Sequence, residues 1–183
     1  MGSITVYTKQ DMRILDALEQ TGRHTAKEKF VMQNEDSSLM RTAYDWLMRH
    51  HPDKENRPAD ADYPVWVSYR RDATMLPGPG YVILELNIDS GLITPINIAK
   101  WGAVNNCSYI PADEEDGKRH RREMKALGLN DVKVCTTQFY PELRKKIEDS
   151  WLRLFDEHIQ LGNDLTYGLI WEVRKEWITN VIQ

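Results

Sequence analysis

The sequence predicts an α+β fold in which a small mixed or antiparallel sheet has helices packed against it. Short segments rich in β-branched and aromatic residues alternate between apolar and polar side chains, as strands do. Other segments repeat apolar residues every three or four positions, as amphipathic helices do. The two kinds of segment are interspersed without a regular βαβ order. A length of 183 residues, 41% of them hydrophobic, suits one globular domain over residues 1–183.

The chain opens with a predicted strand and a predicted helix. The strand covers residues 4–8, where β-branched and aromatic residues dominate. The helix covers residues 11–19, where Met12, Leu15 and Leu18 recur at helical spacing. We expect the helix to end at Gly22, because glycine readily takes the left-handed conformation that closes a helix.

A second helix is predicted to begin at Ser37 or Ser38, because serine is a favourable N-cap residue. It ends before Pro52, since proline cannot continue a helix. A charged loop then leads to a strand over residues 63–69. Pro64 indicates the beginning of this strand or an edge position.

Residues 81–88 show the clearest strand pattern. Even-numbered positions from Val82 to Ile88 are apolar, and Glu85 lies on the opposite, mixed face. After Pro95, residues 96–104 predict a short helix that contains Trp101.

Two further helices follow. Residues 113–125 run from acidic to basic side chains, an order that suits the helix dipole and a solvated face. Residues 141–158 form the strongest helical pattern, because proline suits the first turn. Its apolar residues lie on one stripe: Leu143, Ile147, Trp151, Leu154 and Phe155.

The C-terminal end is unusually aromatic and charged: Trp171-Glu172-Val173-Arg174-Lys175-Glu176-Trp177. Chain ends are commonly frayed and polar, so an end with two tryptophans is expected to dock into the body of the protein. Apolar residues recur every four positions from Leu169 to Val181, which favours a helix, although local alternation also fits a strand. If the tryptophans anchor this segment, Glu176 is held rigidly and is the first candidate for a functional carboxylate, and Glu172 is the second. Local ion pairing with the neighbouring bases is the alternative.

Composition and motifs exclude several classes of protein. A net charge of −4 argues against a protein held on nucleic acid mainly by bulk charge. Two isolated cysteines, Cys107 and Cys135, cannot build a zinc site, so we expect no metal. They fit buried thiols in a reducing cytoplasm. No run approaches the ~20 apolar residues of a membrane span, and no secretory signal precedes the first strand. We therefore expect a cytoplasmic protein that does not enter a membrane.

Phosphate-binding and nucleophile motifs are also missing. The only glycine-dense stretch is Pro77-Gly78-Pro79-Gly80, whose prolines cannot donate backbone N–H groups to a phosphate. GxSxG and HExxH do not occur. Arg70 and Arg71, directly after a predicted strand, suit a phosphate or carboxylate ligand, since arginine binds both in bidentate fashion. Pairing with surface acids is an equally good interpretation.

Several blocks of the chain resemble a family of bacterial and phage proteins known only as a domain of unknown function. The resemblance covers nearly the whole chain and implies a self-contained domain without an assigned activity. The blocks are Ala43-Tyr44-Asp45-Trp46, Tyr63-Pro64-Val65-Trp66, Val82-Ile83-Leu84-Glu85-Leu86, Lys146-Ile147-Glu148-Asp149-Ser150-Trp151 and Trp171-Glu172-Val173-Arg174-Lys175-Glu176-Trp177.

The order of elements is also similar to that of small ADP-ribosyltransferases related to DNA-modifying toxins. Val6-Tyr7-Thr8 corresponds to the first strand of that family, with Thr8 where arginine or histidine is common. Trp66-Val67-Ser68-Tyr69-Arg70 corresponds to its aromatic strand, and Lys175-Glu176-Trp177-Ile178 to the segment that carries its catalytic glutamate.

This second resemblance implies NAD as a substrate. Tyr7 and Thr8 would lie in the NAD-contacting strand, with the nicotinamide near Tyr7 and Tyr69. Arg70 or Arg71 would contact the pyrophosphate.

The same resemblance implies a catalytic role for Glu176. Its carboxylate would stabilise an oxocarbenium-like ribose or activate the acceptor nucleophile. Glu85 is the reserve carboxylate, because it projects from the polar face of a strand.

The alternative hypothesis is a non-enzymatic module that binds a protein or a nucleic acid. Its contact surface would be the basic stretch at residues 118–125 or an exposed tryptophan. The leading hypothesis is a nucleotide-binding, NAD-linked enzyme similar to the ADP-ribosyltransferases, and the non-enzymatic binding module is the alternative.

Overall fold

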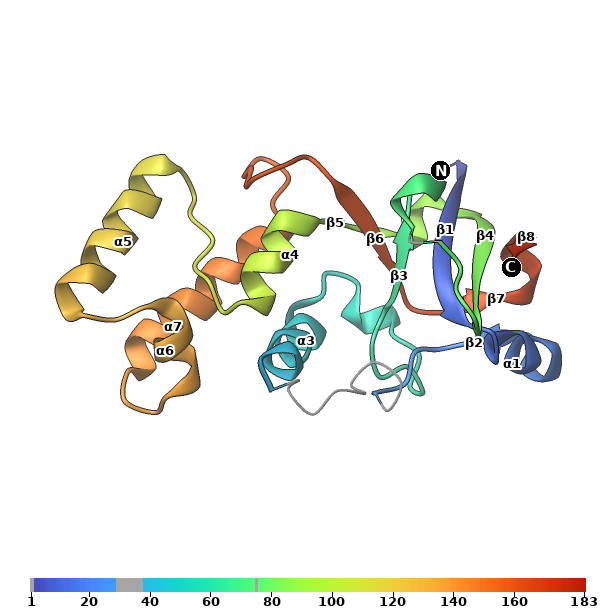
Figure 1. Cartoon of the computed structure of the whole chain (residues 1–183), viewed down its shortest axis with the longest axis horizontal. Helices are drawn as coiled ribbons and strands as arrows, with labels where there is room; N and C mark the ends of the chain where they lie inside the picture. Colours follow the sequence, from blue (N-terminus) through green and yellow to red (C-terminus); the bar gives the residue numbers. More distant parts are fainter. Residues whose placement is uncertain (1, 29–37, 75) are drawn as a thin grey trace. The chain divides into compact units, whose positions relative to one another are not determined.

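The computed structural model describes residues 2–28, 38–74 and 76–183 (Figure 1). The chain divides into two compact units. Unit 1 comprises the described residues of Met1–Gln33, Pro52–Pro95 and Thr166–Gln183, and unit 2 those of Asn34–His51 and Ile96–Leu165. Each unit has a buried interior of its own, and one domain over residues 1–183 stays a prediction.

Unit 1 holds most of the strands. Its elements are β1 (Ser3–Asp11), α1 (Ile14–Thr21), β2 (Arg23–His24), β3 (Val65–Ser68), β4 (Tyr81–Asp89), β6 (Thr166–Ile170), β7 (Val173–Arg174) and β8 (Ile178–Ile182). Single 3₁₀ turns occur at Lys54–Asn56, Arg71–Ala73, Ser90–Leu92 and Lys175–Trp177. The chain passes into unit 2 within β5 (Thr94–Asn97).

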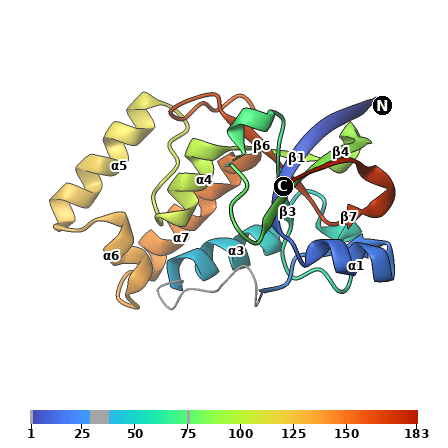
Figure 2. The ribbon, with the colours of Figure 1, turned by 45° about the vertical axis from the view of Figure 1, so that its right-hand side comes forward.

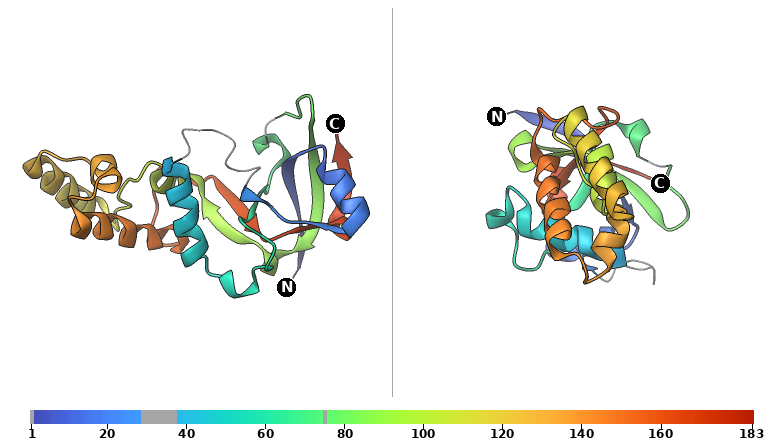
Figure 3. Two further views of the ribbon diagram at one scale, coloured as in Figure 1. Left: turned by 90° about the horizontal axis from the view of Figure 1, so that it is seen from below. Right: turned by 90° about the vertical axis from the view of Figure 1, so that its left-hand side faces the viewer.

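Unit 2 is helical. Its elements are α3 (Ser38–His50), α4 (Ile98–Asn105), α5 (Glu114–Leu127), α6 (Asp131–Thr136) and α7 (Pro141–Ser150), followed by a 3₁₀ stretch over Trp151–Phe155 (Figure 3).

The sheet confirms the predicted α+β class. Its six antiparallel strands follow the order β5-β6-β3-β1-β4-β8 (Figure 1), and Figure 2 shows β6, β3, β1 and β4 from a second side. The longest ladder joins β1 to β4, from Ser3 opposite Asp89 to Asp11 opposite Tyr81. A separate two-stranded ribbon joins β2 to β7. Because β2 and β7 lie far apart in sequence, this ribbon ties the end of the chain to its beginning.

One face of the sheet carries the core of unit 1. The apolar positions predicted for residues 81–88 are all buried, and α1 adds Ile14 and Leu18 to the same cluster. Gly22 ends α1 as predicted, with φ at 74° and its N–H bonded to the Leu18 carbonyl. The cluster contains Val6, Ile14, Leu18, Val65, Val67, Val82, Leu84, Leu86, Ile88, Ile170 and Val173. At about 25 cal/mol per Å² of buried apolar surface, such a cluster is the main stabilising term of the unit.

The interior of unit 2 is built around tryptophans. Trp46 of α3 meets Trp151 edge to face, with ring centroids 5.6 Å apart and planes at 85°. Trp151 also donates its Nε1–H to the carbonyl of Ser108 at 2.8 Å. Cys107 and Cys135 are free and buried, as predicted. The acidic-to-basic stretch forms α5, and its acids lie in the first turn as expected.

The prediction that favoured a C-terminal helix is wrong. The segment after β6 forms β7, one 3₁₀ turn and β8. The recurring apolar residues do not form one stripe, because Leu169 and Val173 are buried whereas Val181 in β8 is 37% exposed. Backbone hydrogen bonds to β2 and to the sheet edge beside β4 outweigh the local helical preference.

Other helix boundaries also differ from the sequence prediction. The helix expected over residues 96–104 begins at Ile98, because residues 94–97 form an edge strand. The helix expected to reach residue 158 ends at Ser150 and tightens into 3₁₀ geometry. For the helix expected to begin at Ser37 or Ser38, the described part of α3 starts at Ser38. Ser37 lies outside the described residues.

The close packing of β6 against its neighbours predicts a sensitive glycine. A methyl group added at Gly168 would lie 2.8 Å from a methyl of Val67 and would overlap Ile93. We expect Gly168→Ala to lower the free energy of unfolding by about 1–3 kcal/mol, the usual cost of overpacking a core. Chemical denaturation measures this change. Gly78→Ala is the control, because no atom lies within 4 Å of its added methyl group. An equal effect of both substitutions would contradict the packing argument.

Candidate functional site

The aromatic C-terminal block is anchored in unit 1 by its apolar residues. Val173 is fully buried, and Trp171 is 7% exposed. The indole N–H of Trp171 donates to the backbone carbonyl of Asp53 at 3.0 Å and to its carboxylate at 3.1 Å. The two tryptophans are therefore not equivalent, because Trp177 is only partly buried.

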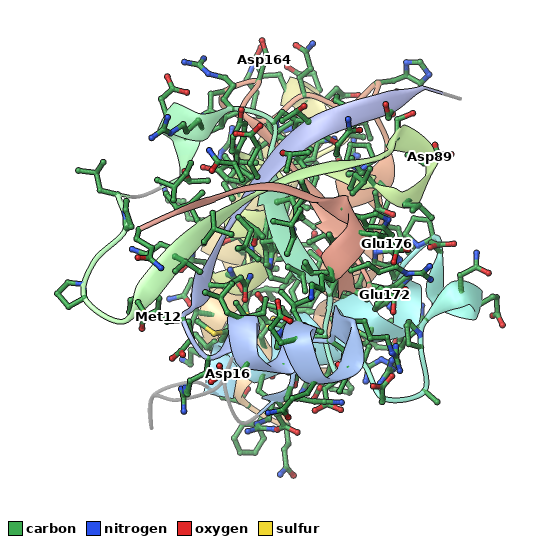
Figure 4. The ribbon with its side chains drawn as sticks, turned by 90° about the vertical axis from the view of Figure 1, so that its right-hand side faces the viewer. Met12, Asp16, Asp89, Asp164, Glu172 and Glu176 are labelled. Atoms are coloured by element: carbon green, nitrogen blue, oxygen red, sulfur yellow. The ribbon has the colours of Figure 1, made fainter. Side chains whose placement is uncertain are left out.

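Glu172, which is labelled in Figure 4, lies between these anchors in the sequence and bridges two arginines. One carboxylate oxygen accepts from Arg23 at 2.9 Å and the other accepts from Arg174 at 2.7 Å. The Glu172 side chain is only 12% exposed. Burial alone raises the pKa of Glu172, but the hydrogen bonds from the two arginines outweigh it, so the pKa lies below its ordinary value. With both oxygens occupied, this carboxylate acts as a structural bridge rather than a general base.

The bridge fixes the short strand β2. Arg23 and His24 lie opposite Arg174 and Val173 in the ribbon, and the Lys175 N–H bonds to the carbonyl of Gly22 at 2.8 Å. Arg23 also pairs with Asp60 at 2.9 Å. As a consequence, the position of the His24 imidazole is set by the C-terminal block.

His24 lines a pocket, which we call the basic pocket, between the end of β1, the start of α1 and β2. Its volume is about 410 Å³, within the usual range of small-molecule sites. The lining residues are Lys9, Gln10, Asp11, Arg13, Ile14, Ala17, His24, Ala26, Lys27 and Tyr81. The first residues of α1 form part of the pocket wall. The partial positive charge of the helix N-terminus therefore adds to the positive charge of the basic side chains in the lining.

The basic pocket is positively charged on balance, because three cations face one carboxylate. Lys9 lies over the Tyr81 ring, with its Nζ 5.1 Å from the centroid. Asp11 receives two hydrogen bonds from the Arg13 guanidinium, at 2.8 and 2.7 Å, and one from the Arg13 backbone N–H at 2.9 Å. These hydrogen bonds lower the pKa of Asp11 to about 2. The Asp11 carboxylate is therefore neutralised by Arg13.

The Lys27 ammonium donates to the Asp60 carbonyl and lies 3.9 Å from the Asp60 carboxylate, which offsets part of its charge. The Lys9 ammonium donates to the Leu76 carbonyl at 2.9 Å and retains its positive charge beside the pocket.

The His24 imidazole adds a neutral polar group to the basic pocket. Burial lowers the pKa of His24 and the nearby ammonium of Lys27 lowers it further, so the ring is uncharged near neutral pH. No group in the part of the chain that the structure describes hydrogen-bonds this ring. An uncharged imidazole can both donate and accept a hydrogen bond, which suits a polar ligand.

A second cavity of unit 1 is lined by both tryptophans and has a volume of about 400 Å³. Its lining residues are Asp53, Asn56, Pro58, Gly91, Leu92, Ile170, Trp171, Glu172, Arg174 and Trp177. The Arg174 guanidinium lies over the Trp177 ring, 5.3 Å from the centroid. Because Arg174 and Glu172 form an ion pair with each other, this cavity offers a ligand fewer unpaired charged groups than the basic pocket does.

The structure brings two predicted site residues together on the sheet. Tyr7 lies directly opposite Glu85 in the β1–β4 ladder. Glu85 accepts a hydrogen bond from the Thr179 hydroxyl at 3.2 Å. Thr8 is buried on the other face, where its hydroxyl donates to the Trp66 carbonyl at 2.8 Å and is committed to the backbone. Tyr69 is half-buried, and burial raises the pKa of its hydroxyl.

The remaining predicted residues are exposed and locally paired. Glu176 is 68% exposed and lies 3.7 Å from Arg174 (Figure 4). Arg70 pairs with Asp72 through a hydrogen bond of 2.9 Å, and Arg71 is exposed in the following turn. Glu176 and the two arginines do not line the basic pocket. Their proposed roles in binding and turning over NAD stay predictions.

Sequence reasoning missed the residues of the basic pocket. Lys9, Arg13 and Lys27 belong to no motif, and His24 has no neighbouring histidine or cysteine that would mark it as a site residue. The available signal was the density of cations near the first helix, where Lys9, Arg13, Arg23 and Lys27 occur within 19 positions. Only the β2–β7 ribbon, which joins distant segments, brings His24 beside the first strand.

Metal and membrane features are missing from the described residues. Within the ranges 2–28, 38–74 and 76–183, no group of three or more His, Cys, Asp or Glu side chains could hold a metal ion. In the same ranges, no helix is long and apolar enough to cross a membrane.

Comparison with known proteins identifies the family of the chain. The model of a domain of unknown function, DUF3841, matches residues 5–179, and the chain belongs to this family. This confirms the expected membership of a family without an assigned function. No curated protein and no solved structure matches the chain.

The Glu172 bridge predicts a pH-dependent contribution to stability. We expect Glu172→Gln to lower the free energy of unfolding by about 1–3 kcal/mol at pH 7, because two charge-assisted hydrogen bonds lose their ionic partner. The folded pKa is depressed, so this contribution is complete above the unfolded pKa of about 4.3 and is lost as the pH falls through the folded value. Denaturant titrations of both proteins between pH 7 and pH 3 measure the difference.

Glu176→Gln is the matched control for this measurement. The exposed pair with Arg174 is expected to contribute less than about 0.5 kcal/mol. A larger loss for Glu176→Gln than for Glu172→Gln would contradict the assignment of Glu172 as the bridge.

Proposed function

We propose that this member of the DUF3841 family binds a mononucleotide-class ligand in the basic pocket. The observation that carries the proposal is the convergence of Lys9, Arg13, Lys27 and His24 on one enclosed space beside the Tyr81 ring. A reducing cytoplasm, in which such ligands are available, is the location that we propose.

The charges favour a ligand that carries a phosphate. Phosphate oxygens accept hydrogen bonds from ammonium groups and are attracted by the positive end of a helix. Lys9, Lys27 and the first residues of α1 line this pocket. Lys9 and Lys27 each have further N–H donors beyond their present bonds, since an ammonium group carries three. The neutral imidazole of His24 adds a donor without adding to the desolvation cost of a fourth cation.

The apolar part of the pocket favours a ligand that also carries a ring. Ile14, Ala17 and Ala26 give the lining an apolar portion, and the Tyr81 ring borders it. A volume of about 410 Å³ lies towards the lower end of the range for small-molecule sites, about 300–1,000 Å³. A mononucleotide suits this space better than a dinucleotide such as NAD.

The geometry favours binding over ADP-ribosyl transfer. Transfer would require a carboxylate aimed at the ribose of a bound NAD. Glu176 is 68% exposed, and Glu85 lies on the sheet opposite Tyr7. Neither carboxylate lines the basic pocket, and Asp11, which does, is committed to Arg13.

A ligand-induced rise in melting temperature tests the proposal. AMP and GMP are expected to raise the melting temperature by several degrees, since a ligand at one hundred times its Kd adds about 2.7 kcal/mol to the stability of the folded state. Adenosine lacks the phosphate and inorganic phosphate lacks the ring, so each should raise the melting temperature less than AMP does. NAD should also raise it less. Lys9→Ala and Lys27→Ala should reduce the rise, each measured against its own ligand-free protein.

Arg70→Ala serves as the matched control, because it removes a cation of unit 1 outside the basic pocket. It should leave the nucleotide effect intact. A nucleotide effect that disappears in Arg70→Ala and survives in Lys27→Ala would move the ligand to the loop after β3 and overturn the proposal. A larger rise with NAD than with AMP would instead support the NAD interpretation.

A further inference from the structure

Unit 2 contains a groove between α5 and α6 that is independent of the basic pocket. Its volume is about 840 Å³. We call it the α5–α6 groove, and its lining residues are Ser108, His120, Arg121, Met124, Lys125, Leu129, Asn130, Asp131, Val132, Lys133 and Thr136.

Local capping explains how the two helices come to flank a groove. Gly128 ends α5 in the left-handed conformation, with φ at 65°, and its N–H bonds back to the last turn. Asn130 then caps α6, its side-chain oxygen accepting from the Lys133 N–H at 2.8 Å. Only three residues separate the helices, so α6 turns back close to α5.

A hydrogen-bonded contact joins the two helices beside the groove. His120 of α5 lies 2.7 Å from the Asp131 carboxylate of α6 through its Nε2, and its ring stacks on Tyr109 at 4.1 Å. The second Asp131 oxygen accepts from the Tyr109 N–H at 2.8 Å. The only carboxylate in the lining is therefore occupied by groups of unit 2.

The cations of the α5–α6 groove, in contrast, are uncommitted. Arg121, Lys125 and Lys133 form no ion pair with any carboxylate in the part of the chain that the structure describes. Their neighbours on α5 do, since Lys118 pairs with Glu114 and Glu115, and Arg119 pairs with Asp116. In a chain of net charge −4, three unpaired cations around one groove indicate an acidic partner.

The floor of the groove is apolar. Met124 is buried beneath it, Leu129 is half-buried, and Val132 is 42% exposed. Phosphate backbones are held by cations and need no apolar floor, and none of the lining residues is Phe, Tyr or Trp on which an unpaired base would stack. An apolar floor with a basic rim matches a helix that carries apolar side chains on one face and acids beside them.

We propose that the α5–α6 groove docks an acidic amphipathic helix of a protein partner. The apolar face of the partner covers Met124, Leu129 and Val132, and its acids pair with Arg121, Lys125 and Lys133. A second copy of the chain is not the expected occupant, because its acidic run at the start of α5 is already paired with Lys118 and Arg119 and Asp116 is buried.

Fluorescence anisotropy with a labelled peptide tests this proposal on the full chain. The probe contains only leucine, alanine and glutamate, with leucines at helical spacing, and it should bind saturably and more weakly at high salt. The double variant Arg121→Glu, Lys125→Glu should lose at least about tenfold in affinity, which corresponds to a modest change in binding free energy. Val132→Asp, at an exposed position, should weaken binding in the same direction.

Arg121→Glu alone should also weaken binding, and Arg122→Glu is its matched control, because it makes the same charge change one residue away on α5 and does not line the groove. It should bind the probe about as well as the unchanged protein, and far-ultraviolet circular dichroism should show the same helix content for all variants. A scrambled peptide of equal composition should bind more weakly, because its leucines no longer share a face.

Three outcomes would overturn the proposal. The first is failure of the probe to bind, or equal binding of the scrambled peptide. The second is a DNA oligonucleotide that binds through Arg121 and Lys125 and is insensitive to Val132→Asp, which makes nucleic acid the occupant. The third is concentration-dependent dimerisation in size-exclusion chromatography that Arg121→Glu abolishes, which makes a second copy the occupant.

Discussion

The bridge from Glu172 to Arg23 and Arg174 is the interaction on which the organisation of unit 1 depends. It lies between Trp171 and Val173, two buried anchors, and therefore cannot move without exposing apolar surface. Through Arg23 it holds β2 to β7, and the chain then continues into β8 at the sheet edge. An interaction between residues 149 positions apart thus closes the unit, and it is mainly the surrounding burial that makes two hydrogen bonds effective.

The candidate ligand site is a consequence of that closure. The ribbon places His24 beside the end of β1 and the start of α1, where Lys9, Arg13 and Lys27 already lie. The α5–α6 groove of unit 2 has its own support in the His120–Asp131 contact. The two surfaces differ in chemistry, because the first is a small pocket with a ring and cations and the second is an open groove with an apolar floor and a basic rim.

Most of the secondary structure could be predicted from local patterns. Alternation identified β1, β3 and β4, whose apolar positions point into one core. Helical spacing identified α1 and α7, and the acidic-to-basic order of charges identified α5. The prediction was wrong where a local pattern had two solutions. The apolar recurrence from Leu169 to Val181 fits a helix as well as two strands, and hydrogen bonds to β2 and β4 decided between them. Pairing with β6 likewise made residues 94–97 an edge strand.

The candidate site was far less predictable, since it depends on contacts between distant segments. The sequence by itself determined the α+β class, the buried thiols, the charge order of α5 and the docking of the aromatic C-terminal block, because each follows from the composition or periodicity of neighbouring residues. Only the tertiary structure decided that Glu172 rather than Glu176 is the held carboxylate, and that His24 joins Lys9 and Lys27. Burial and pairing are properties of the folded environment, so two glutamates four residues apart in one motif acquire different roles.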